Sequence, residues 1–251
     1  MKDITIGIIG GTGGIGRWFA RYFQREGFAV SVWGKETGFD SRQVADTSDV
    51  VIIGVPIGET CSVIERIGPY LNARSLLMDL TSLKAGPVAA MLASSAAEVI
   101  GLHPLFGPSL RSMSGQNIVY CPARCKKWLP WVKEVLERGG ARLLESTPER
   151  HDELMSYVQV LTHLNTITMG LVLEKAGVDP AEIRRFSTPV FRTKLSFIQK
   201  VCEKNPLLSA EIIAGNPHAA DILSRYEESL GELRDLIEDG DASAIVDRIR
   251  K

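Results

Sequence analysis

Residues 4–16 read Ile4-Thr5-Ile6-Gly7-Ile8-Ile9-Gly10-Gly11-Thr12-Gly13-Gly14-Ile15-Gly16, a short apolar run followed by closely spaced glycines. The run has the composition of a buried strand, and Gly11, Gly13 and Gly16 give the spacing G-x-G-x-x-G at its end. In this motif the first glycine permits a tight turn, the second lets the backbone approach a pyrophosphate, and the third lets the helix pack on the strand. The stretch therefore predicts a strand, a turn and a helix that bind a dinucleotide, with its phosphates at the helix N-terminus.

The region from Ile4 to about Ser146 alternates short β-branched runs with longer helical stretches. This pattern is typical of stacked β-α-β units around a parallel sheet. We expect strands over residues 4–9, 29–33, 50–55, 75–80, 98–101, 118–120 and 142–145. We expect helices over residues 14–24, 57–70 and 125–138. The fold class predicted for residues 1–148 is therefore α/β, a Rossmann-type dinucleotide-binding domain.

Residues 149–251 are expected to form an all-α dimerisation domain, because the strand patterns stop after Pro148 and apolar residues recur at helical spacing. Helices are expected over 149–176, 189–202, 207–214, 217–238 and 242–249. The first carries apolar residues around most of its circumference, so it has to be buried on nearly all sides. A module of about a hundred residues meets that demand most readily against a second copy, which predicts a homodimer through this domain.

Composition narrows the possible partners and the location. The 251 residues include 29 Lys and Arg against 30 Asp and Glu, so there is no basic excess of the kind that holds nucleic acid. No apolar run approaches the ~20 residues of a membrane span, and the apolar start is too short for a signal peptide. We expect a cytoplasmic protein that binds neither nucleic acid nor membrane.

The four cysteines are expected to be reduced structural thiols. They show neither C-x-x-C spacing nor the density of a disulfide scaffold, and none has a histidine at metal-ligand spacing. No metal site is predicted. The cysteines are Cys61, Cys121, Cys125 and Cys202.

The end of the second expected strand bears on the choice of cofactor. NAD-binding domains usually place an acid there for the ribose hydroxyls, but the position falls at Gly34. Lys35 follows and could pair with a 2′-phosphate, although Glu36 weakens that field. We expect NADP in preference to NAD. The complete set of residues expected to contact the cofactor is Gly11, Thr12, Gly13, Gly14, Ile15, Gly16, Gly34, Lys35, Val55, Pro56, Thr81 and Lys84.

Two polar segments lie at expected strand ends, which border the ligand crevice of an open α/β sheet. In the segment 101–108, His103 directly follows an apolar strand, and histidine suits the proton transfer that accompanies alcohol oxidation. The alternative is a packed or capping histidine. In the segment 79–84, Ser82 or Thr81 could hydrogen-bond that imidazole or a substrate hydroxyl, with Lys84 as a phosphate contact. The alternative for both hydroxyls is a helix cap.

The helical domain offers two further candidates. Gln159, His163 and Thr166 form a polar stripe on an otherwise apolar helix. These side chains either form hydrogen bonds inside the protein or line a site that contains water. Arg192 lies near the start of an expected helix, with few acidic residues close to it in the sequence. A guanidinium there could bind a carboxylate through two hydrogen bonds. The alternative is a solvated surface arginine.

Taken together, these segments resemble the prephenate dehydrogenase family nearly end to end, particularly the bacterial type often fused to chorismate mutase. The resemblance is carried by the glycine loop and by an ordered series of further segments. These are residues 55–57, 79–84, 101–108 with Gln116, His151-Asp152, 159–163, 187–192 and 205–213.

The resemblance implies oxidative decarboxylation of prephenate to 4-hydroxyphenylpyruvate, with hydride transfer to NAD(P)⁺, in tyrosine biosynthesis. His103 would accept the proton of the ring hydroxyl, and Ser82 would orient His103 and that hydroxyl. Arg192 would bind the ring carboxylate, and His163 would help to form the substrate pocket. Gln159, Ser109 and Gln116 complete the expected substrate set, although many relatives carry an acidic residue in place of Ser109.

Three alternatives remain open. The same chemistry could act on arogenate or on 4-amino-4-deoxyprephenate. A 3-hydroxyacid dehydrogenase would need a catalytic lysine in the helical domain, and Lys194 lacks the usual glycine-rich surroundings. A non-catalytic dinucleotide sensor would bind the cofactor without turning over any cyclohexadienol.

Overall fold

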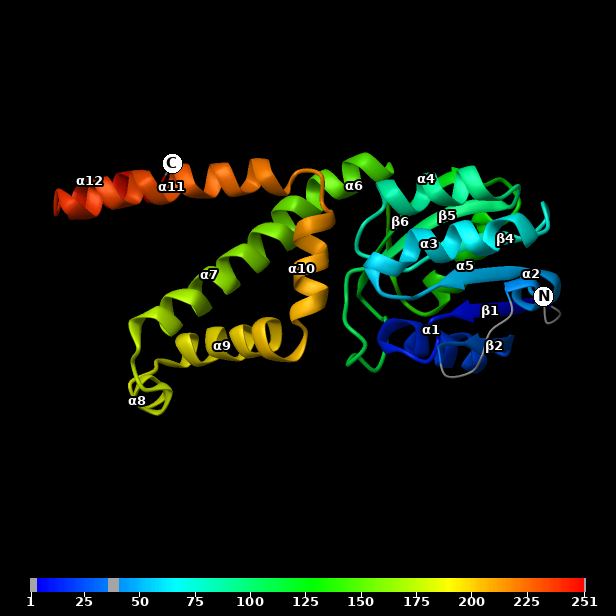
Figure 1. The fold of residues 1–251 in the computed structure, drawn as a ribbon, viewed down its shortest axis with the longest axis horizontal. Coiled ribbons are helices and arrows are strands. Elements are labelled where there is room, and N and C mark those ends of the chain that lie inside the picture. Colours follow the sequence, from blue (N-terminus) through cyan, green and yellow to red (C-terminus); the bar gives the residue numbers. More distant parts are fainter. Residues whose placement is uncertain (1–3, 36–40, 251) are drawn as a thin grey trace. The chain divides into compact units, whose positions relative to one another are not determined.

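The computed structural model describes residues 4–35 and 41–250 and divides into two compact units, Met1–Asp152 and Glu153–Lys251. The first unit contains one seven-stranded sheet in the order β2-β1-β3-β4-β5-β6-β7 with helices on both faces (Figure 1). Its strands are β1 Thr5–Ile9, β2 Ala29–Trp33, β3 Val50–Ile53, β4 Leu76–Asp79, β5 Glu98–Pro104, β6 Asn117–Arg124 and β7 Arg142–Glu145. Its helices are α1 Gly14–Arg25, α2 Ser41–Thr47, α3 Ile57–Ile67, α4 Ala85–Ser94 and α5 Leu129–Arg138, with a 3-10 turn at Gly68–Tyr70.

The core of this unit lies on both faces of the sheet, because successive side chains of a strand point to opposite faces. In β3, Val50 and Ile52 pack into a cluster with α1 and α5, whereas Val51 and Ile53 pack into a second cluster with α2, α3 and α4. All four are fully buried. A strand buried on both faces is continuously apolar, which is why these segments could be recognised in the sequence.

The expectation of stacked parallel units holds from β1 to β5 and is wrong at β6. Strands β1 to β5 are mutually parallel, but β6 pairs antiparallel to β5, and β7 then pairs parallel to β6. The pairing with β6 continues to Pro104 opposite Ile118, so β5 runs three residues past its expected end at 101. His103 therefore lies within the strand and not in a loop after it.

The two outer strands of the sheet are short. β2 has five residues and β7 has four. β7 is largely exposed and carries Arg142 and Glu145 at its ends.

The start of α5 differs from the expected helix over 125–138 for an electrostatic reason. The Glu98 carboxylate accepts the backbone N–H groups of Lys126, Lys127 and Trp128 at 2.9, 3.0 and 3.0 Å. These bonds hold residues 126–128 in a turn, and α5 begins at Leu129. Burial alone would raise the pKa of Glu98, but the N–H donors and the Cys125 thiol outweigh it and lower the pKa to about 2.

The second unit is all-helical, as expected. Helix α6, Pro148–Met155, crosses the division between the units and continues through a π-helical segment, Ser156–Val160, into α7, Leu161–Ala176. The expected uninterrupted helix over 149–176 is therefore wrong in detail, since it contains a π segment. The remaining helices are α8 Pro180–Arg185, α9 Pro189–Ile198 with a π segment at Gln199–Lys204, α10 Pro206–Gly215, α11 Ala219–Glu238 and α12 Ala242–Ile249. No helix among the described residues is long and apolar enough to cross a membrane.

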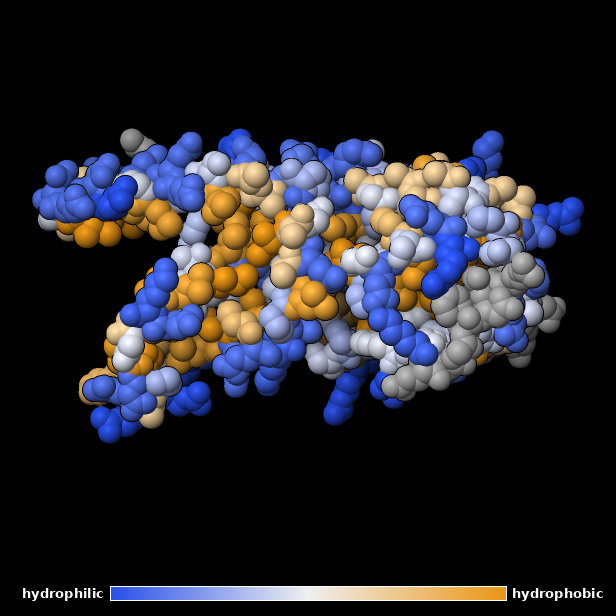
Figure 2. Space-filling view, viewed as in Figure 1, coloured by the Kyte–Doolittle hydropathy of each residue, from blue (hydrophilic) through white to orange (hydrophobic). Residues whose placement is uncertain are grey.

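The helical unit leaves much of its apolar surface uncovered in the single chain. Helix α7 contains no buried residue, and Leu171 and Val172 are 46% and 59% exposed. Figure 2 shows hydrophobic side chains, in orange, gathered over α7 and α9. The burial that the sequence pattern of this helix demands is thus not supplied by the single chain.

Candidate functional site

The glycine loop between β1 and α1 has the geometry of a phosphate cradle. Gly10 has a φ of +85°, and a Cβ there would lie 2.5 Å from the Gly54 carbonyl oxygen, so only glycine fits. A Cβ on Gly16 would lie 2.5 Å from the Gly10 oxygen, which confirms close packing of helix and strand at this position. The tight turn was expected at Gly11, but the left-handed residue is Gly10. Gly11 lacks room because Val32 would lie 2.8 Å from its Cβ.

This loop opens at the switch point of the sheet, where β1 lies between β2 and β3. The Gly54 N–H donates to the Ile9 oxygen at 2.7 Å, which holds the start of Val55-Pro56 beside the glycine loop. Gly13, the N-cap of α1, is exposed, and a Cβ there would meet nothing nearer than 3.6 Å. Free amide groups at a helix N-terminus bind phosphates, so the residues present fit a dinucleotide.

The end of β2 has no room for the acid that holds a ribose. Gly34 is buried, and a Cβ there would lie 2.3 Å from Thr12 Oγ1. Lys35 is 82% exposed and pairs with Glu59 at 2.7 Å, an exposed ion pair of the kind that contributes little free energy. Glu36, which was expected to weaken the field of Lys35, lies outside the described residues.

His103 lies near the carboxyl end of β5. The carboxyl ends of the parallel strands β1, β3 and β4 lie at the same end of the sheet. Its imidazole is 3% exposed. Burial, His151 and Lys84 hold the pKa of His103 well below its usual value of 6.5, so the ring is neutral at physiological pH. A neutral imidazole shielded from bulk water takes a proton only from a group bound against it.

The segment after β4 uses most of its polar groups internally. Thr81 is buried, and its hydroxyl lies 2.9 Å from Asp79 Oδ2 and 2.7 Å from the Leu83 oxygen. Ser82 is half-buried between β4 and α4. Thr81 is therefore bonded within its own loop, and Ser82 presents the more accessible hydroxyl of the two.

Lys84 was expected to contact a phosphate, but the structure gives it a structural role. Its side chain is fully buried, and its ammonium binds the Asp79 carboxylate and, at 2.9 Å, the Leu102 oxygen. Gly101 makes this possible, because a Cβ there would lie 3.0 Å from Lys84 Cδ. The Lys84 ammonium is therefore not exposed to a phosphate.

His151 and Asp152, which carried the resemblance without an assigned role, lie beside His103 in the first unit. His103 Nδ1 is 2.8 Å from His151 Nε2, and His151 Nδ1 is 2.7 Å from Asp152 Oδ1. The sequence contained a signal, an adjacent His-Asp pair at the start of a helix. The contact could not be read from it, because the two histidines are 48 residues apart.

The polar stripe of the helical unit is only partly available for a ligand. Thr166 donates its hydroxyl to the Thr162 oxygen of its own helix at 2.8 Å. Gln159 and His163 are half-buried, and burial together with Lys200 lowers the pKa of His163. Among the described residues, His163 Nδ1 is buried without a hydrogen-bond partner, which favours a water or ligand contact there.

Arg192 lies in the first turn of α9 and is exposed, with its guanidinium 3.3 Å from the Ser187 oxygen. It lines a pocket of about 690 Å³ within the helical unit. Arg184 lines the same pocket, as do the acidic residues Glu174, Asp179 and Glu203. Lys194 lies in another hollow of this unit, beside Thr162 and Asn165.

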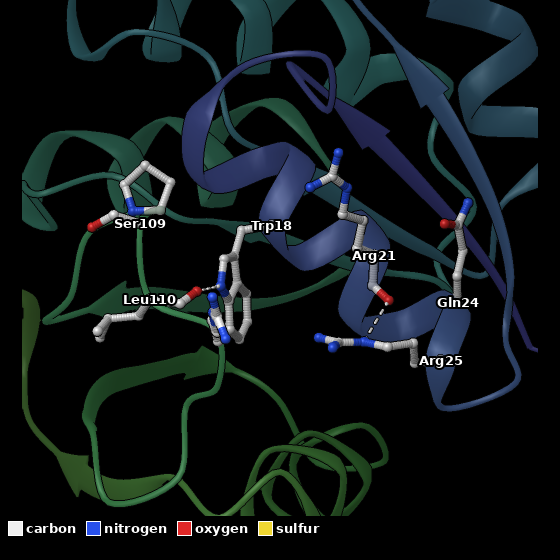
Figure 3. Close-up of a pocket in the computed structure, with 8 residues that line it drawn as sticks. Trp18, Arg21, Gln24, Arg25, Ser109 and Leu110 are labelled. Carbon is white, nitrogen blue, oxygen red and sulfur yellow. Dashed lines mark hydrogen bonds between the residues drawn. The ribbon is translucent and has the colours of Figure 1, made fainter.

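Ser109 lines a different pocket, on the outer side of α1 (Figure 3). There the Trp18 indole donates to the Leu110 oxygen at 2.6 Å, and Arg21 and Arg25 extend from the helix. Gln116 is half-buried in the turn before β6, and its backbone carbonyl oxygen accepts the Arg142 N–H at 2.8 Å.

A Rossmann-type nucleotide-binding unit joined to a helical unit is the class of protein that this fold defines. Family models agree: residues 35–145 match "Prephenate dehydrogenase, nucleotide-binding domain" and residues 147–251 match "Prephenate dehydrogenase, dimerization domain". The chain belongs to the prephenate dehydrogenase family. The glycine loop precedes the matched residues, so its assignment depends on the geometry described above.

Several relatives support this placement. A probable arogenate/prephenate dehydrogenase of Methanocaldococcus jannaschii is 35% identical over 97% of this chain and 59% of its own length. The T-protein of Haemophilus influenzae is 33% identical over 97% of this chain and 65% of its own length. The chain thus spans about three fifths of these relatives. A 4-amino-4-deoxyprephenate dehydrogenase of Streptomyces pristinaespiralis is 27% identical over 93% of this chain and 85% of its own length.

Solved structures support the fold. Prephenate dehydrogenase from A. aeolicus, in complex with hydroxyphenyl propionate and NAD⁺, aligns over 98% of this chain and 95% of that chain with a TM-score of 0.80 at 19% identity. Synechocystis arogenate dehydrogenase aligns over 98% and 96% with a TM-score of 0.77 at 19% identity.

Proposed function

We propose that the protein catalyses the oxidative decarboxylation of prephenate to 4-hydroxyphenylpyruvate, on the route to tyrosine, with hydride transfer to a nicotinamide cofactor. The observation that carries this proposal is the neutral, buried His103, which lies at the carboxyl end of the parallel strands, where the glycine loop opens. Oxidation of an alcohol needs a base beside the hydride donor, and a neutral imidazole meets that need. Membership of the family supports a cyclohexadienol as the alcohol.

His103 takes the proton of the ring hydroxyl as the carbon–hydrogen bond next to that oxygen breaks. The hydride acceptor would be supplied by a nicotinamide cofactor held at the glycine loop and the N-terminus of α1. Arg192 binds the ring carboxylate, whose carbon–carbon bond then breaks to release carbon dioxide and leave an aromatic ring. The electron pair of that bond ends on the ring oxygen, which takes the proton back from His103. Ser82 orients the hydroxyl, and Gln159 and His163 complete the proposed substrate contacts. Ser109, which lines a different pocket beside α1, and Gln116, in the turn before β6, are not proposed as contacts.

The preferred cofactor is proposed to be NADP. In support, a side chain at position 34 would meet Thr12, and the exposed Lys35 is held by a surface ion pair with Glu59 among the residues that the structure describes. Lys35 could therefore turn to a 2′-phosphate at little cost. Comparing kcat/KM with NAD and NADP tests this directly, and a preference for NAD above about tenfold, or 1.4 kcal/mol, would reverse it.

The substrate is tested by a spectrophotometric assay of the purified protein with prephenate, arogenate and 4-amino-4-deoxyprephenate. Reduction of the cofactor with prephenate is the expected result. Turnover of only one of the other two would move the proposal to that substrate, which the names of several relatives make the chief alternative. Cofactor binding with no turnover of any of the three would favour a dinucleotide sensor.

Substitution of Arg192 by alanine is expected to raise the KM for prephenate strongly while leaving kcat within a few fold. A charge-assisted hydrogen bond contributes about 1.5–3 kcal/mol, so the KM should rise about 10- to 100-fold. Steady-state kinetics measure this, with Arg184→Ala, which alters the same pocket, as the matched control. A KM unchanged in the Arg192 variant would remove this residue from the carboxylate site.

The protein is also proposed to form a homodimer through the helical unit. Support comes from the dimerization-domain match and from side chains such as Phe186, Val190 and Ile249, which are 77%, 69% and 72% exposed in the single chain. Large apolar side chains that are exposed in this way favour a protein interface. Light scattering at micromolar concentration should give twice the chain mass, and a monomer there would count against the proposal.

A further inference from the structure

Three buried side chains form a continuous hydrogen-bonded line in the first unit. His103 Nδ1 meets His151 Nε2 at 2.8 Å, and His151 Nδ1 meets Asp152 Oδ1 at 2.7 Å. Their exposed fractions are 3%, 1% and 1%, and the two imidazole planes cross at 68° with centroids 5.0 Å apart. We call this line the His103–His151–Asp152 chain.

Asp152 determines which atom donates in its hydrogen bond with His151. Burial alone would raise the pKa of Asp152, but hydrogen bonds from His151 and from the backbone N–H groups of Ala85 and Lys84 outweigh it and lower the pKa. Those N–H groups lie 2.9 and 2.8 Å from the carboxylate, at the start of α4. An ionised carboxylate only accepts hydrogen bonds, so His151 Nδ1 carries a proton and donates it.

The donor of the hydrogen bond between His151 and His103 follows from this. We take both imidazoles as neutral, so that each has one N–H, and a His151 with its N–H at Nδ1 then has a lone pair on Nε2. That lone pair accepts a hydrogen bond, and His103 Nδ1 therefore carries the proton between the rings. Since His103 is neutral, its Nε2 has no proton and is the basic atom.

We propose that His151, held by Asp152, is a positioning residue that sets the tautomer of His103 and thereby makes Nε2 the base. This inference rests on the proposed function, in which His103 takes the proton of the substrate hydroxyl. The hydroxyl O–H bond breaks, its proton bonds to His103 Nε2, and its electron pair completes the new carbonyl as the hydride leaves the same carbon. The proton later returns to the ring oxygen.

The carboxylate at the far end of the His103–His151–Asp152 chain also affects the protonated base. When His103 becomes an imidazolium, its Nδ1–H donates to His151 as a charge-assisted bond, and the negative charge of Asp152 lies one ring further along. Lys84, whose buried charge opposes a second positive charge on His103, is neutralised by Asp79. The Asp152 carboxylate therefore offsets part of the cost that burial, His151 and Lys84 impose on a cation at His103.

Nuclear magnetic resonance of the ring nitrogens tests the tautomer without any need for activity. In protein with isotope-labelled histidine, assigned with a His103→Asn variant, His103 should carry its proton on Nδ1. His151→Leu removes the acceptor, so the His103 signals should shift toward a mixture of the two tautomers. His151→Gln keeps an oxygen acceptor close to the position of Nε2, so the Nδ1-protonated form should be largely restored.

Kinetics provide the second readout. An orienting partner of a catalytic histidine is worth about 10- to 10⁴-fold in turnover, so His151→Leu should lower kcat about 10²-fold with the KM for prephenate nearly unchanged. His151→Gln should recover most of that loss. His218→Gln serves as the matched control, since His218 lies in the other unit, at the N-cap position of α11 without a side-chain capping bond, and it should keep the wild-type kcat.

The outcomes separate this inference from the proposed function. A wild-type His103 protonated on Nε2 would overturn the inference, as would a His151→Leu enzyme with wild-type tautomer and turnover. The wild-type spectrum decides the tautomer even if the leucine variant fails to fold. Absence of turnover in the wild-type protein with all three substrates would instead remove the proposed function and leave the tautomer result standing.

Discussion

Substitution of His103 by alanine is expected to lower kcat with prephenate by ~10²- to 10⁴-fold, the usual contribution of a positioned base. The cofactor dissociation constant should change little, because the glycine loop and the helix N-terminus that cradle the phosphates do not involve this side chain. Stopped-flow or steady-state rates measure the first effect, and fluorescence titration of the cofactor measures the second. Near wild-type turnover would exclude His103 as the base.

The pH dependence of kcat/KM should also show that His103 is the base. A base must be unprotonated to act, so kcat/KM falls as the pH drops below its pKa. Burial, together with His151 and Lys84, holds the pKa of His103 well below 6.5, so the acidic fall should begin below that pH and the profile should be flat through neutrality. An acidic limb centred near 6.5 would point to a solvated histidine instead.

Substitution of Lys84 by methionine is expected to lower the free energy of unfolding by about 3–5 kcal/mol, the cost of breaking one side of a buried ion pair. Lys84 and Asp79 are both 0% exposed, and the variant would leave the Asp79 carboxylate without its counter-charge. Within the described residues, Asp79 Oδ1 already lacks a hydrogen-bond partner, which increases the dependence on Lys84. At about 2–4 °C per kcal/mol, thermal melts should show a loss of Tm of about 10 °C.

A second variant separates charge from packing in this prediction. Adding Asp79→Asn to Lys84→Met removes the buried charge but keeps an acceptor for the Thr81 N–H, which lies 3.0 Å from Asp79 Oδ2. The double variant should regain much of the lost Tm, because replacing both members of a buried pair is often close to neutral. A double variant as unstable as the single one would show that packing, not charge, is what Lys84 provides.

Local sequence signals predicted most of the elements. β2 and β7 have the predicted bounds because each is a short run flanked by glycine or polar turn residues. The reversal of β6 was missed, since a strand carries no local mark of its direction relative to a neighbour. The end of β5 was misplaced for the same reason, because it is the pairing of Pro104 with Ile118 that extends this strand.

The candidate site divides along similar lines. The glycine loop and His103 were found because each stands next to a recognisable strand. The roles of Lys84 and His151 depend on contacts made only in the folded chain: Lys84 reaches Leu102 across 18 residues, and His151 reaches His103 across 48. A charged residue in a loop is normally solvated, so nothing local indicates that Lys84 is buried.

The two outer strands of the sheet bear on how copies of this protein could associate. An exposed strand edge invites addition of a strand from another molecule, and short or charged edges discourage it. β2 and β7 have only five and four residues, and β7 places Arg142 and Glu145 at its margins. Growth of the sheet by lateral addition of a second molecule is therefore disfavoured, and the protein is protected against fibre-like stacking at the edges of its α/β unit.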